Sequence, residues 1–127
     1  MAEKEFVTWE QVESFVDDIA KTYKGVKLSG IYGLPRGGLI LAVMLSHRLH
    51  IPMLMAPCQD CMIVDDICDS GESLLHYCRD SSLEEKPDWT IVTMFYKENI
   101  LGVHPAVYKY KKEDKWIVFP WEDKEDI

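Results

Sequence analysis

The chain has 127 residues, of which 47% are hydrophobic, and this size and composition fit one compact domain over residues 1–127. Its 14 basic and 22 acidic residues give a formal charge of −8, which argues against general binding of nucleic acid because that needs a basic surface. No apolar run is as long as a membrane span, and the residues after Met1 are too charged for a secretory leader, so we expect a cytoplasmic protein without a membrane partner.

The first predicted element is an amphipathic helix that begins at Thr8. Thr8 and Gln11 have the spacing of a capping box. Apolar residues then recur at helical spacing as far as Tyr23. Gly25 is expected to end this helix.

The next part of the chain alternates short apolar runs with breakers. Residues 28–33 predict a buried strand, and "LPRGG" at 34–38 predicts a loop, since proline and paired glycine break regular structure. Residues 39–50 are apolar nearly all round, which indicates a helix packed on a sheet. Two further short strands are predicted at 53–56 and 61–66.

The second half continues the alternation. A helix is predicted over residues 70–80, followed by strands at 89–96, 105–110 and 115–122, the last one broken by Pro120. Because strands alternate with helices and the central strands lack polar alternation, the pattern predicts an α/β fold. We expect a mostly parallel, Rossmann-like central sheet of about five strands flanked by helices.

The four cysteines are Cys58, Cys61, Cys68 and Cys78. Cys58 and Cys61 form a C-x-x-C pair, but no second such pair or histidine pair supplies the remaining ligands of a zinc site. Reduced thiols are therefore the default expectation, and a Cys58–Cys61 disulfide stays open.

In parallel sheets, ligands bind beyond the carboxyl ends of the strands. Three loops follow predicted strands here, "LPRGG" at 34–38, "DICDSGES" at 66–73 and "KENI" at 97–100. We expect one crevice to gather all three.

The string "DDICDSGES", residues 65–73, combines two kinds of binding group. Ser70 and Ser73 bracket the start of the predicted helix, whose free amides can hold a phosphate, and Gly71 lets the backbone approach closely. Asp65 and Asp66, outside this cradle, can accept hydrogen bonds from sugar hydroxyls or hold Mg²⁺. The ligand that fits both ends is a ribose 5-phosphate; the alternative is a strand-to-helix turn with acidic caps.

Other candidates are weaker on their own. Arg36 beside Gly37 and Gly38 suits pyrophosphate, because arginine forks to phosphate oxygens and glycine exposes amides, although a surface arginine in a turn would look the same. Taken alone, Lys97 is more often a solvated strand end and Trp116 more often core packing.

The string "IVDDICDSGES" resembles the phosphoribosyl pyrophosphate (PRPP) binding motif of type I phosphoribosyltransferases: an apolar run, two acids, two residues, Asp, Ser or Thr, Gly, any residue, then Ser or Thr. Residues 6–20, 33–49 and 115–122 are similar to the N-terminal helix, the pyrophosphate loop with its helix, and the C-terminal purine-binding segment of the purine branch. The resemblance covers nearly the whole chain.

For PRPP, the resemblance implies a role for each residue of the motif. Asp65 and Asp66 would contact the ribose hydroxyls, directly or through Mg²⁺, and Asp69 would be the catalytic general base near purine N7. The 5′-phosphate would lie on the backbone of Asp69, Ser70, Gly71, Glu72 and Ser73.

For the other ligand groups, the resemblance implies pyrophosphate binding by Pro35, Arg36 and Gly37. Lys97 would donate to the 6-oxo group of the purine, Trp116 would stack on it, and backbone groups near Ile117 would meet its 2-position. Glu122 matches an acidic position near the metal.

The resemblance implies a Mg²⁺-dependent purine phosphoribosyltransferase that uses PRPP and a 6-oxopurine, as a homodimer or homotetramer. One feature departs from the family: the long hood loop that closes over the site is missing, because only Pro57–Asp60 joins the strands at 53–56 and 61–66. Three activities stay open, a transferase first, then a protein that binds PRPP or a nucleotide without efficient turnover, then a nucleotide N-glycosidase. The purine base is open as well.

Overall fold

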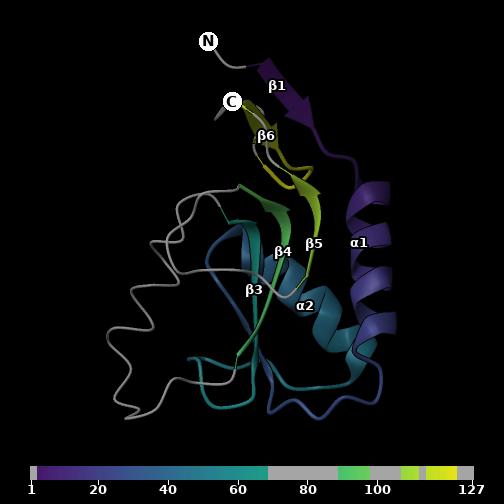
Figure 1. Cartoon of the computed structure of the whole chain (residues 1–127), viewed down its shortest axis with the longest axis vertical. Helices are drawn as coiled ribbons and strands as arrows, with labels where there is room; N and C mark the ends of the chain where they lie inside the picture. Colours follow the sequence, from purple (N-terminus) through teal and green to yellow (C-terminus); the bar gives the residue numbers. More distant parts are fainter. Residues whose placement is uncertain (1–2, 69–88, 98–106, 112–113, 123–127) are drawn as a thin grey trace.

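The computed structural model describes residues 3–68, 89–97, 107–111 and 114–122 (Figure 1). Its elements in chain order are β1 (Glu3–Phe6), α1 (Trp9–Thr22), β2 (Ile31–Gly33), α2 (Gly37–Leu49), β3 (Met62–Cys68), β4 (Thr90–Tyr96), β5 (Val107–Lys111) and β6 (Lys115–Val118). The central sheet is parallel in the order β2-β3-β4-β5, and β1 pairs with β6 in a separate parallel ribbon. Figure 1 places this ribbon beyond the arrowheads of β4 and β5. The α/β class with a mostly parallel sheet is confirmed, and the part of the central sheet that the structure describes has four strands.

The start of α1 follows from its cap. The Thr8 hydroxyl accepts a hydrogen bond from the Gln11 backbone N–H at 3.1 Å, and the Gln11 side chain accepts one from the Thr8 N–H at 2.9 Å. The predicted capping box is therefore present. Past the end of α1, Gly25 has φ +82°, a left-handed conformation that glycine adopts without strain.

The helix α2 begins at Gly37, two residues before the predicted start at residue 39. The predicted loop over 34–38 is therefore wrong for its last two residues. Gly37 and Gly38 are in the first helical turn because this turn packs directly on β3. A Cβ atom on Gly38 would overlap the Val64 carbonyl group, so only glycine permits this approach.

The strand β2 has neighbours on both sides, and the chain reaches them one after the other. Ile31 bridges to Met53 on one side and pairs with Met62 of β3 on the other, both in parallel. The chain thus leaves β2 through α2 to one edge and returns to form β3 on the opposite side. Such a switch point opens a crevice at the carboxyl ends of the two central strands, which is where ligands bind in sheets of this type.

The predicted strand at 53–56 is wrong, because only Met53 takes part in a bridge. The segment that follows stays at the amino ends of β2 and β3. The Ser29 N–H donates to the Asp60 carbonyl at 2.9 Å, and the Met62 N–H donates to the Gly30 carbonyl at 3.0 Å. Residues 53–61 therefore turn back at the end of the sheet opposite to the crevice.

Two apolar clusters lie on the two faces of the sheet. Both helices pack on one face through Val12, Phe15, Val16, Ile19, Leu41, Ala42 and Leu45, against strand residues that include Ile31, Met62, Val64, Val92 and Met94. The other face carries a smaller buried cluster of Tyr32, Leu34, Cys61, Ile63, Cys68 and Tyr96. Burial on both faces explains why these strands read as continuous apolar runs.

The strand β1 was not predicted, because four exposed residues, three of which are charged, carry little strand signal. Its register with β6 pairs Glu3 with Lys115 and Lys4 with Trp116.

The predicted helix at 70–80 and Cys78 lie outside the described residues. None of the described cysteines, Cys58, Cys61 and Cys68, takes part in a disulfide bond. In the ranges that the structure describes, no helix combines the length and the apolar composition needed to cross a bilayer.

Candidate active site

Asp65 and Asp66 form a pair of half-buried carboxylates inside β3. The strand continues to Cys68, beyond its predicted end at residue 66, so both acids are held by the sheet. The Asp66 N–H donates to Asp65 Oδ1 and the Ile67 N–H donates to Asp66 Oδ1, each at 2.8 Å. These backbone bonds orient the two carboxyl groups at the carboxyl end of the sheet.

The two acidic side chains lie close together and are partly shielded from solvent. Burial raises the pKa of Asp65 to about 8, and the adjacent Asp66 adds to the rise through a hydrogen bond and its negative charge. At neutral pH such a pair is stabilised either by a shared proton or by a bound cation. Two adjacent carboxylates are oxygen ligands of the kind that Mg²⁺ prefers together with water and substrate phosphates, so the donor set fits this ion.

The Arg36 turn lies directly against this acid pair. The Leu34 N–H donates to the Val64 carbonyl at 2.9 Å, which ties the end of β2 to β3. The exposed Arg36 then precedes α2, after a cis peptide bond between Pro35 and Arg36. A Cβ atom on Gly37 would overlap the Asp66 carboxylate, so the backbone of the turn and the acid are in close contact. The structure thus brings together the residues predicted for pyrophosphate and for ribose.

Lys97 occupies the matching position at the end of β4. Its backbone N–H donates to the Cys68 carbonyl at 3.0 Å, and its side chain is exposed. Lys97 therefore lies at the same edge of the sheet as Asp65 and Asp66, as the sequence predicts.

The C-terminal segment is fastened beside the end of β4. Phe119 packs edge to face on Phe95, with ring centroids 5.8 Å apart. On β6, the Trp116 side chain is 58% exposed and therefore available for stacking. The Ile117 side chain is only 5% exposed and belongs to the core, which leaves its backbone as the part that could meet a ligand.

Glu122 is exposed in the turn that follows, where its N–H donates to the Phe119 carbonyl at 3.1 Å. Among the residues that the structure describes, no three acidic, histidine or cysteine side chains come close enough to hold a metal ion. Glu122 is thus not brought into a three-ligand cluster with Asp65 and Asp66.

The remaining predicted residues, Asp69, Ser70, Gly71, Glu72 and Ser73, lie outside the described residues. A feature that the sequence analysis missed is the packing role of glycine. A Cβ atom on Gly33 would lie 2.6 Å from the Gly38 carbonyl oxygen, so glycines on both partners keep β2 and α2 in contact. The paired Gly37–Gly38 is the signal in the sequence for this close packing, in addition to the exposed amides that it predicts.

No family model matches the chain. Among solved structures, a purine phosphoribosyltransferase from Pyrococcus horikoshii Ot3 is 31% identical, with a TM-score of 0.81 and 94% of each chain covered. A xanthine-guanine-hypoxanthine phosphoribosyltransferase from Helicobacter pylori is 17% identical, with a TM-score of 0.78 over 98% of this chain and 97% of that one. A hypothetical protein from Neisseria gonorrhoeae with bound ppGpp is 20% identical, with a TM-score of 0.68 over 98% of this chain and 92% of that one. At their lower identities, the last two likenesses bear on the fold alone.

Proposed function

We infer, from the premise that this chain belongs to the purine branch of the type I phosphoribosyltransferases, that it transfers the 5-phosphoribosyl group of PRPP to a 6-oxopurine and releases pyrophosphate. The observation that carries the proposal is the contact of the Gly37 backbone with the Asp66 carboxylate. It supports one site in which a pyrophosphate group and a ribose, which are adjacent in PRPP, would each find their own binding residues.

On the PRPP side, Arg36 would fork to pyrophosphate oxygens and stabilise the charge that grows there as the bond to C1 of the ribose breaks. Asp65 and Asp66 would orient the ribose through its 2′- and 3′-hydroxyls. These two carboxylates would also hold Mg²⁺, which supplies positive charge to the leaving group when it is bound.

On the purine side, Lys97 would donate a hydrogen bond to the 6-oxo group, and the exposed Trp116 would stack on the ring. Backbone groups near Ile117 would meet the 2-position. N9 then forms the new bond to C1 as pyrophosphate departs, and Asp69 would take the proton that the base gives up near N7.

The direct test is product formation. The protein is mixed with PRPP, Mg²⁺ and each of hypoxanthine, guanine, xanthine and adenine, and the products are resolved by chromatography. We expect a nucleoside monophosphate with at least one 6-oxopurine and none with adenine. Ribose 5-phosphate in the control without a base would instead indicate hydrolysis, the reaction class of an N-glycosidase. A complete lack of product would contradict both reactions.

The proposed general base gives a second prediction. Asp69→Asn should lower kcat by about 100-fold or more, because a positioned base contributes about 10² to 10⁴ to such a reaction. PRPP affinity, measured by calorimetry, should largely survive, since the proposed phosphate cradle would consist of backbone groups. Asp114→Asn, an exposed acid on the chain before β6, is the matched control and should keep full activity. Unchanged turnover in Asp69→Asn would show that another group is the base.

A second candidate function is binding of PRPP or a nucleotide without efficient turnover. It is favoured by the course of residues 53–61, which stay at the amino ends of the strands and so cannot cover the site. A cation-like ribose must be kept from water, and in the family the hood loop closes over the site and excludes water. The Neisseria gonorrhoeae protein of this fold carries ppGpp, a nucleotide. Calorimetric binding of PRPP or GMP, with no product in the assay above, would establish this alternative.

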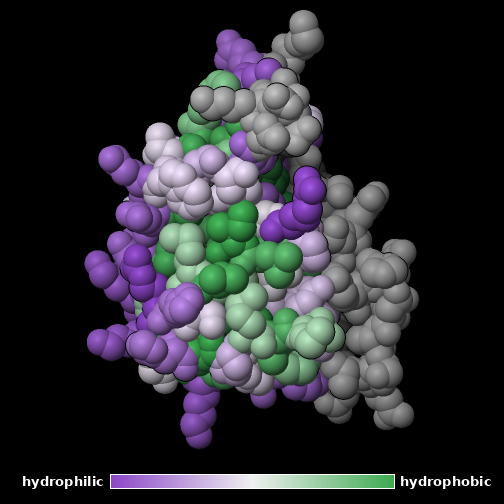
Figure 2. Space-filling model, turned by 180° about the vertical axis from the view of Figure 1, so that it is seen from behind, coloured by the Kyte–Doolittle hydropathy of each residue, from purple (hydrophilic) through white to green (hydrophobic). Residues whose placement is uncertain are grey.

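We also propose that the chain forms a homodimer or homotetramer through the outer face of α2. This helix is apolar nearly all round, and such helices are normally buried on all sides. Figure 2 shows hydrophobic side chains gathered at the centre of the face on which α2 lies. On α2, Leu39 and Val43 have 40% and 45% of their surfaces exposed, and a spacing of four residues places them on one face of the helix. A second copy of the same face would supply an apolar partner.

Val43→Glu should therefore shift the chain to a monomer, because a charge in an apolar interface is costly to bury. Light scattering after gel filtration measures the change. Val26→Glu is the matched control, since Val26 is 48% exposed on the loop after α1 and is not part of α2. If both variants keep the mass of the parent protein, the α2 face is not the interface.

A further inference from the structure

A cavity of about 470 Å³ lies between the C-terminal ends of α1 and α2. This volume is within the range of small-molecule sites. Leu49 and His50, at the end of α2, help to line it, whereas Arg36 precedes the other end of the helix. The 13 residues of α2 span about 20 Å at 1.5 Å per residue. The cavity is therefore separate from the candidate active site, at the opposite end of the sheet.

The inner wall of this cavity is apolar. Tyr23, Leu28, Leu49 and Ile51 line it, and all four are partly buried against the main core. On the α1 side the wall includes Ala20, whose methyl group fills little space. Gly25, with φ +82°, turns the chain away from the end of the helix. A hollow thus remains between the helix ends and the loop that follows α1.

The rim of the cavity is basic. Lys21, Lys24 and Arg48 line it together with one acid, Asp17, which forms an ion pair with Arg48. In the described part of the chain, neither Lys21 nor Lys24 has an acidic partner within ion-pair distance. The rim therefore has a local excess of positive charge, whereas the whole protein carries a formal charge of −8.

Basic residues near helix C-termini are also explained by the helix dipole. That explanation covers Lys21 and Arg48, which lie in the last turns of α1 and α2. It does not account for a hollow beside them, or for Lys24, which follows the end of α1. Burial also raises the pKa of Tyr23, so its hydroxyl stays neutral and can donate a hydrogen bond at the cavity wall.

We propose that this cavity binds a small organic anion with an apolar body. The apolar body would rest on Leu28, Leu49 and Ile51, and the acidic group would be held at the rim by Lys21 and Lys24. Shape and charge both support this class of ligand. The wall would shield the apolar surface of the ligand from water, and the lysines supply positive charge opposite to that of its acidic group.

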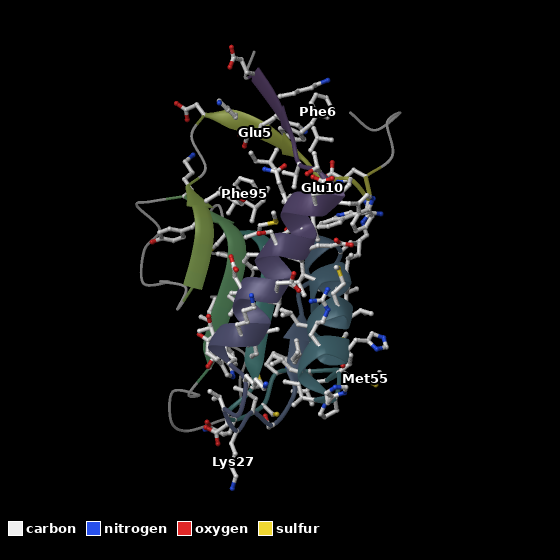
Figure 3. All side chains as sticks on the ribbon, turned by 90° about the vertical axis from the view of Figure 1, so that its right-hand side faces the viewer. Glu5, Phe6, Glu10, Lys27, Met55 and Phe95 are labelled. Atoms are coloured by element: carbon white, nitrogen blue, oxygen red, sulfur yellow. The ribbon has the colours of Figure 1, made fainter. Side chains whose placement is uncertain are left out.

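The probe for the test is 8-anilinonaphthalene-1-sulfonate, which has such a body and one negative charge. We expect saturable fluorescence enhancement with one site per chain. Lys24→Glu should weaken binding by about tenfold, since it reverses a charge at the rim. Lys27→Glu is the matched control on the same loop, because Figure 3 shows Lys27 pointing away from the molecule, and it should change affinity by less than about twofold. Ala20→Met, which fills the hollow, should also weaken binding.

Two further measurements locate the site. The uncharged analogue N-phenyl-1-naphthylamine should bind more weakly than the sulfonate and should not distinguish Lys24→Glu from the parent. Amide shifts on addition of the sulfonate should cluster at residues 20–28 and 48–51. The proposal is overturned if binding does not saturate, if Lys27→Glu weakens it as much as Lys24→Glu, or if the shifts cluster on α2 around Val43.

Discussion

Gly37→Ala is expected to lower kcat/KM for PRPP by about 100-fold, which corresponds to about 2.7 kcal/mol of lost transition-state stabilisation. The added Cβ atom would overlap the Asp66 carboxylate, so either the Arg36 turn or the acid has to move. A displacement of about 1 Å is enough for such a loss, because Arg36 and Asp66 bind neighbouring parts of one substrate. Steady-state kinetics of nucleotide formation measures the effect.

Gly25→Ala is the control that separates a damaged site from a less stable fold. Gly25 has φ +82° and open space around the missing Cβ, so alanine there is strained only by its backbone and costs about 1–2 kcal/mol. Both variants should melt at a lower temperature than the parent, whereas only Gly37→Ala should lose activity. Equal kcat/KM values for the two variants would mean that the contact with Asp66 has no functional role.

Asp65→Asn is expected to make the protein more stable at pH 8 and to remove part of the pH dependence of its stability. The folded-state pKa of Asp65 is raised from 3.8 to about 8, mainly by burial and further by Asp66. Between these two values the folded state holds one proton more than the unfolded state, so stability falls as pH rises. The stabilising contribution of the protonated form is complete below pH 3.8 and is lost as pH rises through about 8.

Thermal melting from pH 4 to 9, without divalent cations, checks this prediction. At pH 8 Asp65→Asn should melt at least about 4 °C above the parent, which corresponds to about 1 kcal/mol in a domain of this size, and the two curves should converge near pH 4. Asp60→Asn is the control, because Asp60 is exposed and has φ 58°, a conformation that asparagine tolerates. Added Mg²⁺ should stabilise the parent at pH 8 more than Asp65→Asn. Parallel melting curves for parent and variant would contradict the assignment.

The elements that local physics controls were predictable from particular residues. Thr8 and Gln11 marked the start of α1 because a capping box is complete within four residues. The apolar runs that became β3 and β4 indicated burial on both faces, and hence a parallel sheet. In the same way, Asp65 and Asp66 could be singled out, since an apolar run that ends in two acids places them at the carboxyl end of a strand.

Features that depend on distant segments were missed or misplaced. Met53–Ala56 has strand composition but joins the sheet only at Met53, because the chain has to return to β3 within a few residues. Residues 3–6 have no strand signal of their own and become β1 only through their pairing with β6. The early start of α2 depends on a contact between Gly38 and Val64, which are 26 positions apart in the chain.

The sequence by itself determined the α/β class, the helix cap and the identity of the acidic and basic groups at the strand ends, because each depends on residues that are neighbours in the chain. Only the tertiary structure decided that the Arg36 turn contacts Asp66, that residues 53–61 lie away from the site, and that a basic-rimmed cavity opens between α1 and α2. The physical reason is packing: which surfaces meet depends on how helices and strands fill space together, and that cannot be inferred from any one segment.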